Sequence, residues 1–351
     1  MAALQWMIYG ANGYTGELIA REAKTRGHRP VLAGRNSDKI AKLAGELGFE
    51  HRIFSLDASD AIAPHLEGIG LVLHCAGPFA KTSAPVMDAC IRAKAHYLDI
   101  TGEISVFERA RTKNAEAEAA GVVVCPGVGF DVIPTDCLAA TLKDALPDAD
   151  HLALGFDTQS GLSAGTAKTT VEGIPQGGKV RKEGKIIDVP HAYRVRRIDF
   201  GNGEKLAMTL PWGDVSTAFY TTGIPNIEVY TPSSPVLVFA TKGANAFRWL
   251  LGWGPLQSML KGIAGKAKGP SAEQRERLPT YVWGEVTNAR GDKKTAHIRT
   301  ANGYSITVTG ALAVVEYLLG HRPRGGTYTP SRLMGADLVT KLPGSSALTI
   351  T

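Results

Sequence analysis

The chain has 351 residues, 44% of them hydrophobic and 21% charged, so it is long enough for two domains and apolar enough for a buried core. Its formal net charge is +6, but the lysines and arginines are scattered, which argues against a nucleic-acid-binding face and suits small anionic ligands better. The four cysteines show no CxxC spacing and the nine histidines are isolated, so we expect no metal site.

Signals for export and for a membrane span are both missing from the sequence. The N-terminus runs into an apolar strand without the charged start and cleavage site of a signal peptide. No uninterrupted apolar stretch approaches the about 18 residues that a membrane-spanning helix needs. We therefore expect a cytoplasmic protein that is soluble or at most attached to a membrane surface.

The first part of the chain alternates short apolar runs with amphipathic stretches, the pattern of βαβ units in a parallel sheet. Expected strands lie near residues 5–9, 30–33, 51–55, 70–75, 96–100 and 121–125. Expected helices lie at 16–26, 37–47, 83–93 and 105–120. Ser37 and Ser83 are the expected N-caps of two of them. The pattern predicts an α/β fold with a doubly wound, Rossmann-type parallel sheet over residues 1–135.

Beyond about residue 150 the sequence changes to β-rich segments with polar turns. These segments are 193–199, 205–209, 227–231, 280–288 and 294–300. The turns at 201–203 and 290–292 are typical of antiparallel hairpins. We expect an inserted α+β domain with a mixed sheet over residues 136–310. The C-terminal segment, residues 311–351, could return to the first domain.

A glycine-rich loop follows the first expected strand directly. It comprises Gly10, Ala11, Asn12, Gly13, Tyr14, Thr15 and Gly16. Glycines between the first strand and the first helix allow a sharp turn and close approach of the backbone to a pyrophosphate. The positive end of the following helix then faces the diphosphate. We predict that this loop binds a dinucleotide.

The end of the second strand indicates which dinucleotide. An NAD-preferring domain tends to place an acidic residue here, whereas this chain has Arg35. The guanidinium can bind a 2′-phosphate through charge-assisted hydrogen bonds, and Asn36 and Ser37 add neutral donors. Asp57, after the third strand, is placed to bond the adenine edge or to cap a turn. The predicted cofactor is NADP(H).

The loops after the fourth and sixth strands complete the predicted cofactor site, because ligands of open α/β sheets bind beyond the carboxyl ends of the strands. The residues concerned are Ala76, Gly77, Pro78 and Phe79 after the fourth strand, and Gly127, Gly129 and Phe130 after the sixth. The two later glycines would let the backbone approach the nicotinamide, with Phe130 near it. We interpret the neighbouring acids Asp99, Glu103 and Asp131 as loop caps or helix N-terminus partners in preference to proton donors.

Several motifs together resemble the saccharopine dehydrogenase-like oxidoreductases, and more closely the branch of the mycobacterial trans-acting enoyl reductases. The motifs are 9–16, 33–35, 75–79, 97–103 and 129–136, with 211–218 and 222–227 in the second domain. The resemblance implies NADPH use and a Rossmann domain with an inserted mixed-sheet domain. It also implies reduction of an enoyl thioester carried on a lipid or polyketide.

Hydride transfer also needs a proton donor, and the candidates in the second domain are Tyr220, Asp214, Lys168 and His191. Tyr220 could donate a proton to an enolate, and Asp214 adjoins Trp212 in an expected partly desolvated pocket. A tyrosine in a β-rich domain is more often a packed residue with a bonded hydroxyl, so both interpretations stay open.

Residues 244–263 combine apolar positions at helical spacing with flanking cations at Lys242, Arg248, Lys261, Lys266 and Lys268. The segment is compatible with peripheral membrane contact, with a lid over a long acyl chain, or with a core or homodimer interface.

Three functions remain open at this point. The first is an NADPH-dependent oxidoreductase that reduces an apolar enoyl or acyl-type substrate, such as a lipid or acyl thioester. The second is a saccharopine reductase-like amino-acid or imine oxidoreductase, which the lack of a clear array of carboxylate-binding arginines disfavours. The third is a non-catalytic NADP(H)-binding interaction protein at a membrane surface.

Overall fold

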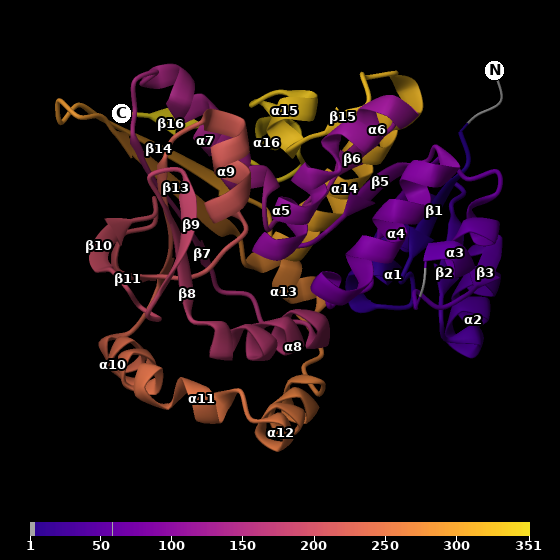
Figure 1. Ribbon diagram of the computed structural model, residues 1–351, viewed down its shortest axis with the longest axis horizontal. Helices are drawn as coiled ribbons and strands as arrows, with labels where there is room; N and C mark the ends of the chain where they lie inside the picture. The colour runs from indigo at the N-terminus through magenta and orange to yellow at the C-terminus, as the bar shows by residue number, and fades with distance from the viewer. Residues whose placement is uncertain (1–3, 58) are drawn as a thin grey trace. The chain divides into compact units, whose positions relative to one another are not determined.

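The computed structural model describes residues 4–57 and 59–351, and it divides into two compact units. The first unit contains the chain up to Asp131 together with Tyr304–Met334. The second contains Val132–Gly303 and Gly335–Thr351. Figure 1 follows the chain through both units from indigo to yellow.

The first unit is built on a parallel sheet in the order β15-β6-β5-β4-β1-β2-β3. The strands are β1 (Trp6–Tyr9), β2 (Val31–Gly34), β3 (His51–Ile53), β4 (Leu71–His74), β5 (His96–Asp99), β6 (Val123–Cys125) and β15 (Gly326–Thr327). The strand order changes direction between β1 and β4, which defines the switch point where ligands bind in such sheets. The predicted doubly wound α/β fold is confirmed.

Helices cover both faces of this sheet, as the strand pattern requires. They are α1 (Tyr14–Thr25), α2 (Ser37–Leu47), α3 (Ser59–Ile62), η1 (Ala63–Leu66), α4 (Phe79–Ala93), α5 (Ile104–Thr112), α6 (Asn114–Ala120), α14 (Gly303–Gly320) and α15 (Pro330–Met334). Successive residues of a strand point to opposite faces. In β1, Trp6 and Ile8 join the core beneath α1, α2 and α14, whereas Met7 and Tyr9 join the core on the α4 side.

The N-caps of two helices differ from those expected. Asn36, rather than Ser37, caps α2, and its side-chain oxygen accepts from Lys39 N at 3.0 Å. Helix α4 begins at Phe79, so Ser83 is buried inside it and is not an N-cap. The serines predicted the wrong caps because in each case a residue before the serine, Asn36 or Pro78, is the last one with non-helical backbone.

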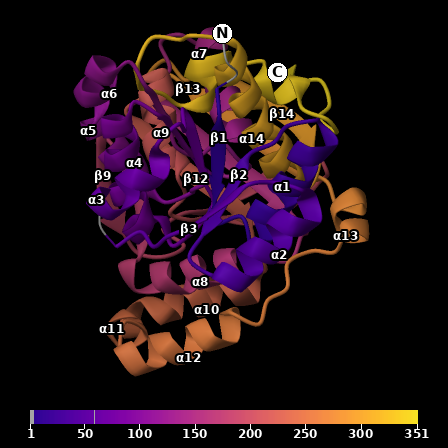
Figure 2. The ribbon, with the colours of Figure 1, turned by 90° about the vertical axis from the view of Figure 1, so that its right-hand side faces the viewer.

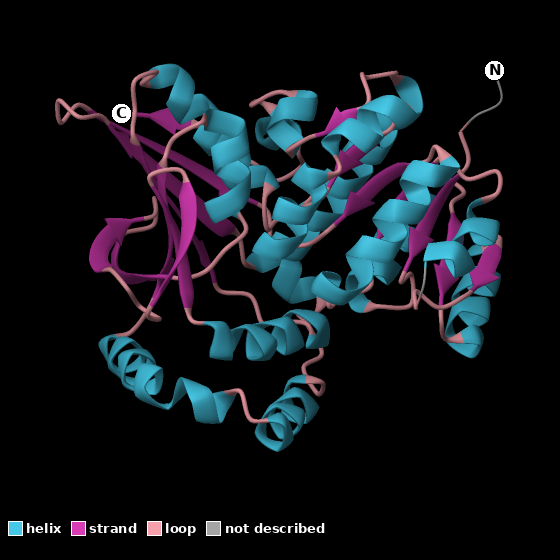
Figure 3. Cartoon of the chain, in the orientation of Figure 1, coloured by secondary structure: helices cyan, strands magenta, loops and turns pink. Residues whose placement is uncertain are grey.

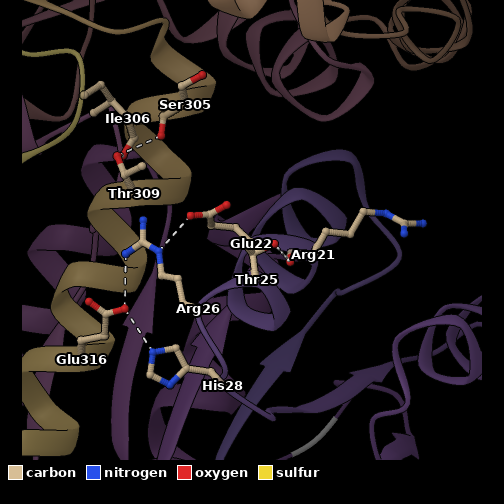
Figure 4. A network of polar contacts seen from close by, with 9 residues as sticks. All are labelled: Arg21, Glu22, Thr25, Arg26, His28, Ser305, Ile306, Thr309 and Glu316. Carbon is tan, nitrogen blue, oxygen red and sulfur yellow. Dashed lines mark hydrogen bonds and ion pairs between the residues drawn. The ribbon is translucent and has the colours of Figure 1, made fainter.

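Helix α14 brings a late part of the chain into the first unit. Its Val308, Leu312 and Val315 are buried in the same cluster as β1. Glu316 Oε1 lies 3.3 Å from Arg26 Nη1 and 3.1 Å from His28 Nε2, which links the helix to the end of α1 (Figure 4).

By length and composition alone, α14 is the one described helix that could cross a membrane. Core helices of globular domains pass the same test, and the buried face of α14 packs on the sheet. We therefore interpret α14 as a core helix.

The second unit holds a mixed sheet in the order β10-β11-β12-β7-β13-β14-β16, with β8 and β9 attached through β12. The strands are β7 (His151–Thr158), β8 (Gly178–Lys182), β9 (Lys185–Val189), β10 (Val195–Asp199), β11 (Glu204–Thr209), β12 (Asn226–Pro232), β13 (Thr280–Thr287), β14 (Lys293–Thr300) and β16 (Thr349–Ile350). Strand β12 runs parallel to β7 and antiparallel to β11.

The helices of the second unit are α7 (Ile133–Ala145), α8 (Ala164–Gly173), η2 (Ile174–Gln176), α9 (Asp214–Thr222), α10 (Pro235–Ala244), η3 (Asn245–Phe247), α11 (Arg248–Leu251), α12 (Gly254–Ala264), α13 (Ala272–Arg277) and α16 (Leu338–Lys341). Helices α7 and α9 contact the sheet and each other, and Figure 3 shows them beside its strands. A Cβ at Gly284 of β13 would lie 2.7 Å from Leu142 of α7, so the glycine lets this helix approach closely.

The unit boundaries fall at 131/132 and 303/304, rather than at the expected 135/136 and 310/311. The C-terminal segment is divided between the units. Strand β15 pairs with β6 in the first sheet, whereas β16 pairs with β14 in the second. Strands of two residues carry too little pattern for this division to be expected from the sequence.

Candidate functional site: a dinucleotide-binding loop

The turn from β1 into the start of α1 requires glycine at two positions for steric reasons. Gly10 has φ +83°, and a Cβ there would lie 2.8 Å from Ala76 N. A Cβ on Gly16 would lie 2.3 Å from Gly10 O, so the first turn of α1 packs directly on the loop. Both contacts follow from a sharp turn off the strand and tight packing of helix on sheet.

Tyr14, Thr15 and Gly16, the last residues of the predicted glycine loop, lie in the first turn of α1. Gly13, its N-cap, has extended backbone (φ −80°, ψ 162°) and no side chain that could cap the helix. Its N–H donates to Gly10 O at 3.0 Å, which closes the turn. The dipole and N–H groups of a helix start without a capping side chain favour an anion. The loop therefore fits the diphosphate of a dinucleotide.

Arg35 directly follows β2, the position at which the sequence predicts a contact with the 2′-phosphate of NADP. It is exposed directly after β2, and we find no ion pair or hydrogen bond for its guanidinium among residues 4–57 and 59–351. Asn36 uses its side-chain oxygen to cap α2, which leaves its amide hydrogens as donors. The first acid after β2 is Asp38, inside α2. An exposed arginine without a competing carboxylate suits a phosphate better than a ribose hydroxyl.

Asp57 is held by a local contact on the same side of the sheet. Ser55 Oγ donates to Asp57 Oδ2 at 2.5 Å, so the carboxylate is at least partly occupied as a turn cap. Arg35 and Asp57 both act electrostatically on the buried Tyr9 hydroxyl, whose pKa burial raises to about 12. Arg35 and Asp57 follow the adjacent parallel strands β2 and β3 and so lie at the same edge of the sheet.

The loop after β4 is positioned by a pair of side chains that sequence reasoning missed. Thr82 Oγ1 donates to Ala76 O at 2.7 Å, so its only hydrogen is used and His74 Nε2, at 2.9 Å, must donate to the threonine. Burial lowers the pKa of His74 to about 3, which keeps the ring neutral. This pair fixes the backbone of Ala76, Gly77 and Pro78, the predicted passage beneath the cofactor.

The acids at the carboxyl ends of the strands act mainly as caps, as the sequence led us to expect. Both carboxylate oxygens of Glu103 accept from the start of α4, at 2.8 Å from Phe79 N and from Ala80 N. The buried Asp99 accepts from Thr101 N at 3.0 Å and from Gly127 N at 2.9 Å. Burial raises the pKa of Asp99 to about 6, against the lowering effect of these hydrogen bonds.

The loop after β6 is drawn against α14. A Cβ on Gly129 would lie 2.9 Å from Thr307 Cγ2, and Phe130 N donates to Thr307 Oγ1 at 3.0 Å. Gly129 is therefore required by packing within the protein, a reason that the sequence did not reveal. Gly127 has φ +76° and its N–H donates to Asp99, so the backbone turn requires a glycine at this position.

Asp131 is the acid in this region whose proton affinity is most changed. Burial raises the pKa of Asp131 to about 7, and the nearby charge of Glu103 adds to the rise. Its carboxylate lies against Gly102, where a Cβ would be 2.8 Å from Oδ2. A carboxyl group with a pKa near neutrality is able to hold and release a proton at physiological pH.

The second-unit candidates do not form one cluster. Asp214 and Tyr220 both lie on α9, six residues apart and so on different faces. Asp214 is buried, and the Tyr220 ring lies 5.9 Å from the Arg181 guanidinium carbon. Lys168 is exposed on α8, which Figures 1 and 2 show at the other end of this unit from α9.

A cavity of about 320 Å³ opens on the second sheet and is lined by two arginines. Arg194 pairs with Glu228 at 3.1 Å and Arg196 with Glu285 at 2.9 Å. Both guanidinium groups are therefore already engaged by carboxylates of the protein. Across residues 4–57 and 59–351 we find no group of side chains with metal-ligand geometry.

The comparisons with known proteins agree with this site. Residues 6–125 match the saccharopine dehydrogenase NADP binding domain. The protein named "Probable mitochondrial saccharopine dehydrogenase-like oxidoreductase" of Arabidopsis thaliana is 28% identical over 203 residues, which cover 50% of this chain and 44% of that protein. The trans-acting enoyl reductase of Mycobacterium bovis is 27% identical over 207 residues, covering 54% of this chain and 49% of that protein. The matched regions thus span less than half of either relative.

A solved structure extends the likeness to both units. The chain superposes on apo saccharopine dehydrogenase (L-Glu forming) of Saccharomyces cerevisiae with a TM-score of 0.66 and 11% identity, over 99% of this chain and 100% of that one. At this identity the match shows the fold alone. The predicted family resemblance and NADP cofactor are confirmed by the domain match. Residues 6–125 thus form a saccharopine dehydrogenase NADP binding domain, and the matched relatives are named saccharopine dehydrogenase-like oxidoreductase and trans-acting enoyl reductase.

Proposed function

We propose that this protein is an NADPH-dependent oxidoreductase that reduces an apolar enoyl or acyl-type substrate. The proposed use of NADPH rests on Arg35, which is exposed after β2 and has no ion pair among the described residues. When bound, NADPH supplies the hydride for such a reduction. The glycine loop binds the diphosphate, and Arg35 orients the adenosine end through its 2′-phosphate.

The substrate class rests on two observations. Relatives at 27% and 30% identity are named trans-acting enoyl reductases. Each arginine lining the second-unit cavity already pairs with a protein carboxylate, Glu228 or Glu285, which offsets its attraction for a substrate carboxylate. This favours an apolar substrate over an amino-acid or imine substrate of the saccharopine type.

A reduction of this kind also needs a proton at the acceptor carbon or oxygen. Asp131 is the first-unit group suited to hold that proton, because the pKa of its carboxyl is about 7. Tyr220, Asp214 and Lys168 remain the candidates in the second unit. Asp131→Asn and Tyr220→Phe variants compare a candidate from each unit. A variant that lacks the proton donor should lose turnover but keep its affinity for NADPH.

The test is oxidation of NADPH by the full chain in the presence of a long-chain trans-2-enoyl thioester. The matched control reaction supplies an amino acid together with a 2-oxo acid, the reactants of a saccharopine-type reductive condensation. Turnover with the enoyl thioester alone supports the proposal. Turnover with the amino-acid pair alone contradicts the substrate class. Tight NADPH binding without turnover on either would favour the non-catalytic interaction protein.

A further inference from the structure

The helices α10 to α12 expose an unusual share of large apolar side chains. Among the described residues, most of the exposed large hydrophobics gather between 236 and 263: Val236, Leu237, Phe239, Phe247, Trp249, Leu250, Trp253, Met259 and Ile263. Phe239 is 82% exposed and Trp249 is 77% exposed. Figure 2 shows these helices as a layer on the outer side of α8. We call this set of residues on α10–α12 the apolar layer.

The apolar layer has almost no core of its own. Helices α8, α11 and α12 contain no buried residue, and α10 contains only Val238. Polar contacts hold the layer to its neighbours. Gln257 Nε2 donates to Val171 O at 3.2 Å, and Lys261 pairs with Glu172 at 2.5 Å. Large exposed apolar side chains gathered on consecutive helices indicate an interaction site, because covering them removes apolar area from water.

The charge around the apolar layer is of one sign. Between Glu228 and Glu273 the chain has no acidic residue, and it has five cations: Lys242, Arg248, Lys261, Lys266 and Lys268. Lys261 is neutralised by Glu172 of α8. Lys242, Lys266 and Lys268 are exposed. A partner that complements the apolar layer must therefore present a surface that is both apolar and anionic.

A second copy of the chain fits this requirement poorly. A two-fold symmetric dimer places the same patch on both sides of the interface, so the cations of both copies would share it without an acidic partner from residues 229–272. An anionic phospholipid surface offers acyl chains below a layer of phosphate groups. Tryptophan rings and lysines are the residues that anchor helices at such an interface.

We propose that the apolar layer docks this protein on an anionic phospholipid membrane surface. Phe239, Trp249 and Trp253 enter the boundary between headgroups and acyl chains, and Lys242, Lys266 and Lys268 meet the phosphates. The interruption at Gly254 and Pro255, where α12 starts, lets the helices lie in the membrane plane as separate short segments. This inference stands independently of the proposed reaction.

The test is co-sedimentation of the full chain with vesicles of phosphatidylcholine alone or mixed with phosphatidylglycerol. We expect binding to the mixed vesicles that weakens as salt is raised. A double Phe239→Ser, Trp249→Ser variant should lower the partition coefficient by at least about tenfold, from the lost burial of two aromatic side chains. Lys266→Glu should lower it by about fivefold or more, from the loss of one cation near the surface.

Matched controls keep the result interpretable. Ile350→Ser removes another exposed apolar side chain, and Lys294→Glu makes the same charge change on β14. Neither should alter vesicle binding. NADPH affinity, measured on every variant, reports separately on the cofactor site and on folding.

Three results would overturn the inference. One is equal binding to neutral and anionic vesicles, and another is equal loss of binding in the control variants. The third is no vesicle binding together with a concentration-dependent dimer that the Phe239→Ser, Trp249→Ser variant abolishes, since the apolar layer would then be a self-association surface.

Discussion

Arg35→Ala is the sharpest single perturbation of the cofactor site. The guanidinium has no ion pair among the described residues, so its removal costs no interaction that stabilises the fold. With NADPH bound, it would make charge-assisted hydrogen bonds to the 2′-phosphate, together worth about 2 kcal/mol. The dissociation constant for NADPH should rise about thirtyfold, whereas that for NADH should change little.

Calorimetric titration of wild type and variant with each cofactor measures this difference. Lys42→Ala is the matched control, because it removes the same charge from an exposed position farther along α2. That variant should lose only the small part of the affinity that comes from long-range attraction. Equal weakening of NADPH and NADH in Arg35→Ala would refute the role of Arg35. A loss as large in Lys42→Ala would show that net charge, not a direct contact, is responsible.

Three further predictions concern the frame of the site. Gly16→Ala should abolish NADPH binding and lower the melting temperature, because its Cβ would lie 2.3 Å from Gly10 O, whereas Gly45→Ala on α2, with open space around its Cβ position, should be neutral or stabilising by about 0.5 kcal/mol. Glu103→Gln should lower the urea-unfolding free energy by about 1 kcal/mol, because the amide keeps one uncharged acceptor for the start of α4 and loses the other; an unchanged value would show that α4 needs no carboxylate cap. Asp131→Asn should remove a pH dependence of stability, measured by urea unfolding at acid and at neutral pH.

The sign of that pH dependence follows from the raised pKa. Burial favours the protonated form of Asp131, so its contribution is fully present below its unfolded pKa of 3.8 and is lost as the pH rises through its folded pKa of about 7. Relative to wild type, Asp131→Asn should gain about 2 kcal/mol between about pH 4 and pH 8, after allowance for partial exposure of the group. A constant difference between the two proteins would contradict the raised pKa.

The cofactor domain could be predicted from its sequence because its signals are local. Buried strands of a parallel sheet appear as short apolar runs, and six of them were found at the right places. The return of α14 to the first unit was only left open, since contacts such as that between Arg26 and Glu316 join residues far apart in the chain. Strands β7, β8 and β9 were missed: β8 and β9 have only short apolar runs between charged residues, whereas the apolar run of β7, residues 152–156, was overlooked.

The site shows the same division. The glycine loop and Arg35 were identified from residue type and position along the chain. The functions of His74, Thr82 and Gly129 depend on which backbone atoms lie beside them, which no spacing in the sequence reveals. Asp131 was interpreted as a cap because its sequence neighbours gave no measure of its burial, and burial is what raises its pKa.

A pair of calorimetric titrations of the wild-type protein, one with NADPH and one with NADH, tests the cofactor assignment most directly. We expect NADPH to bind with a dissociation constant at least about tenfold lower than that for NADH, because only NADPH carries the phosphate that Arg35 is placed to bind. Equal affinity for the two cofactors, or binding of neither, would contradict it.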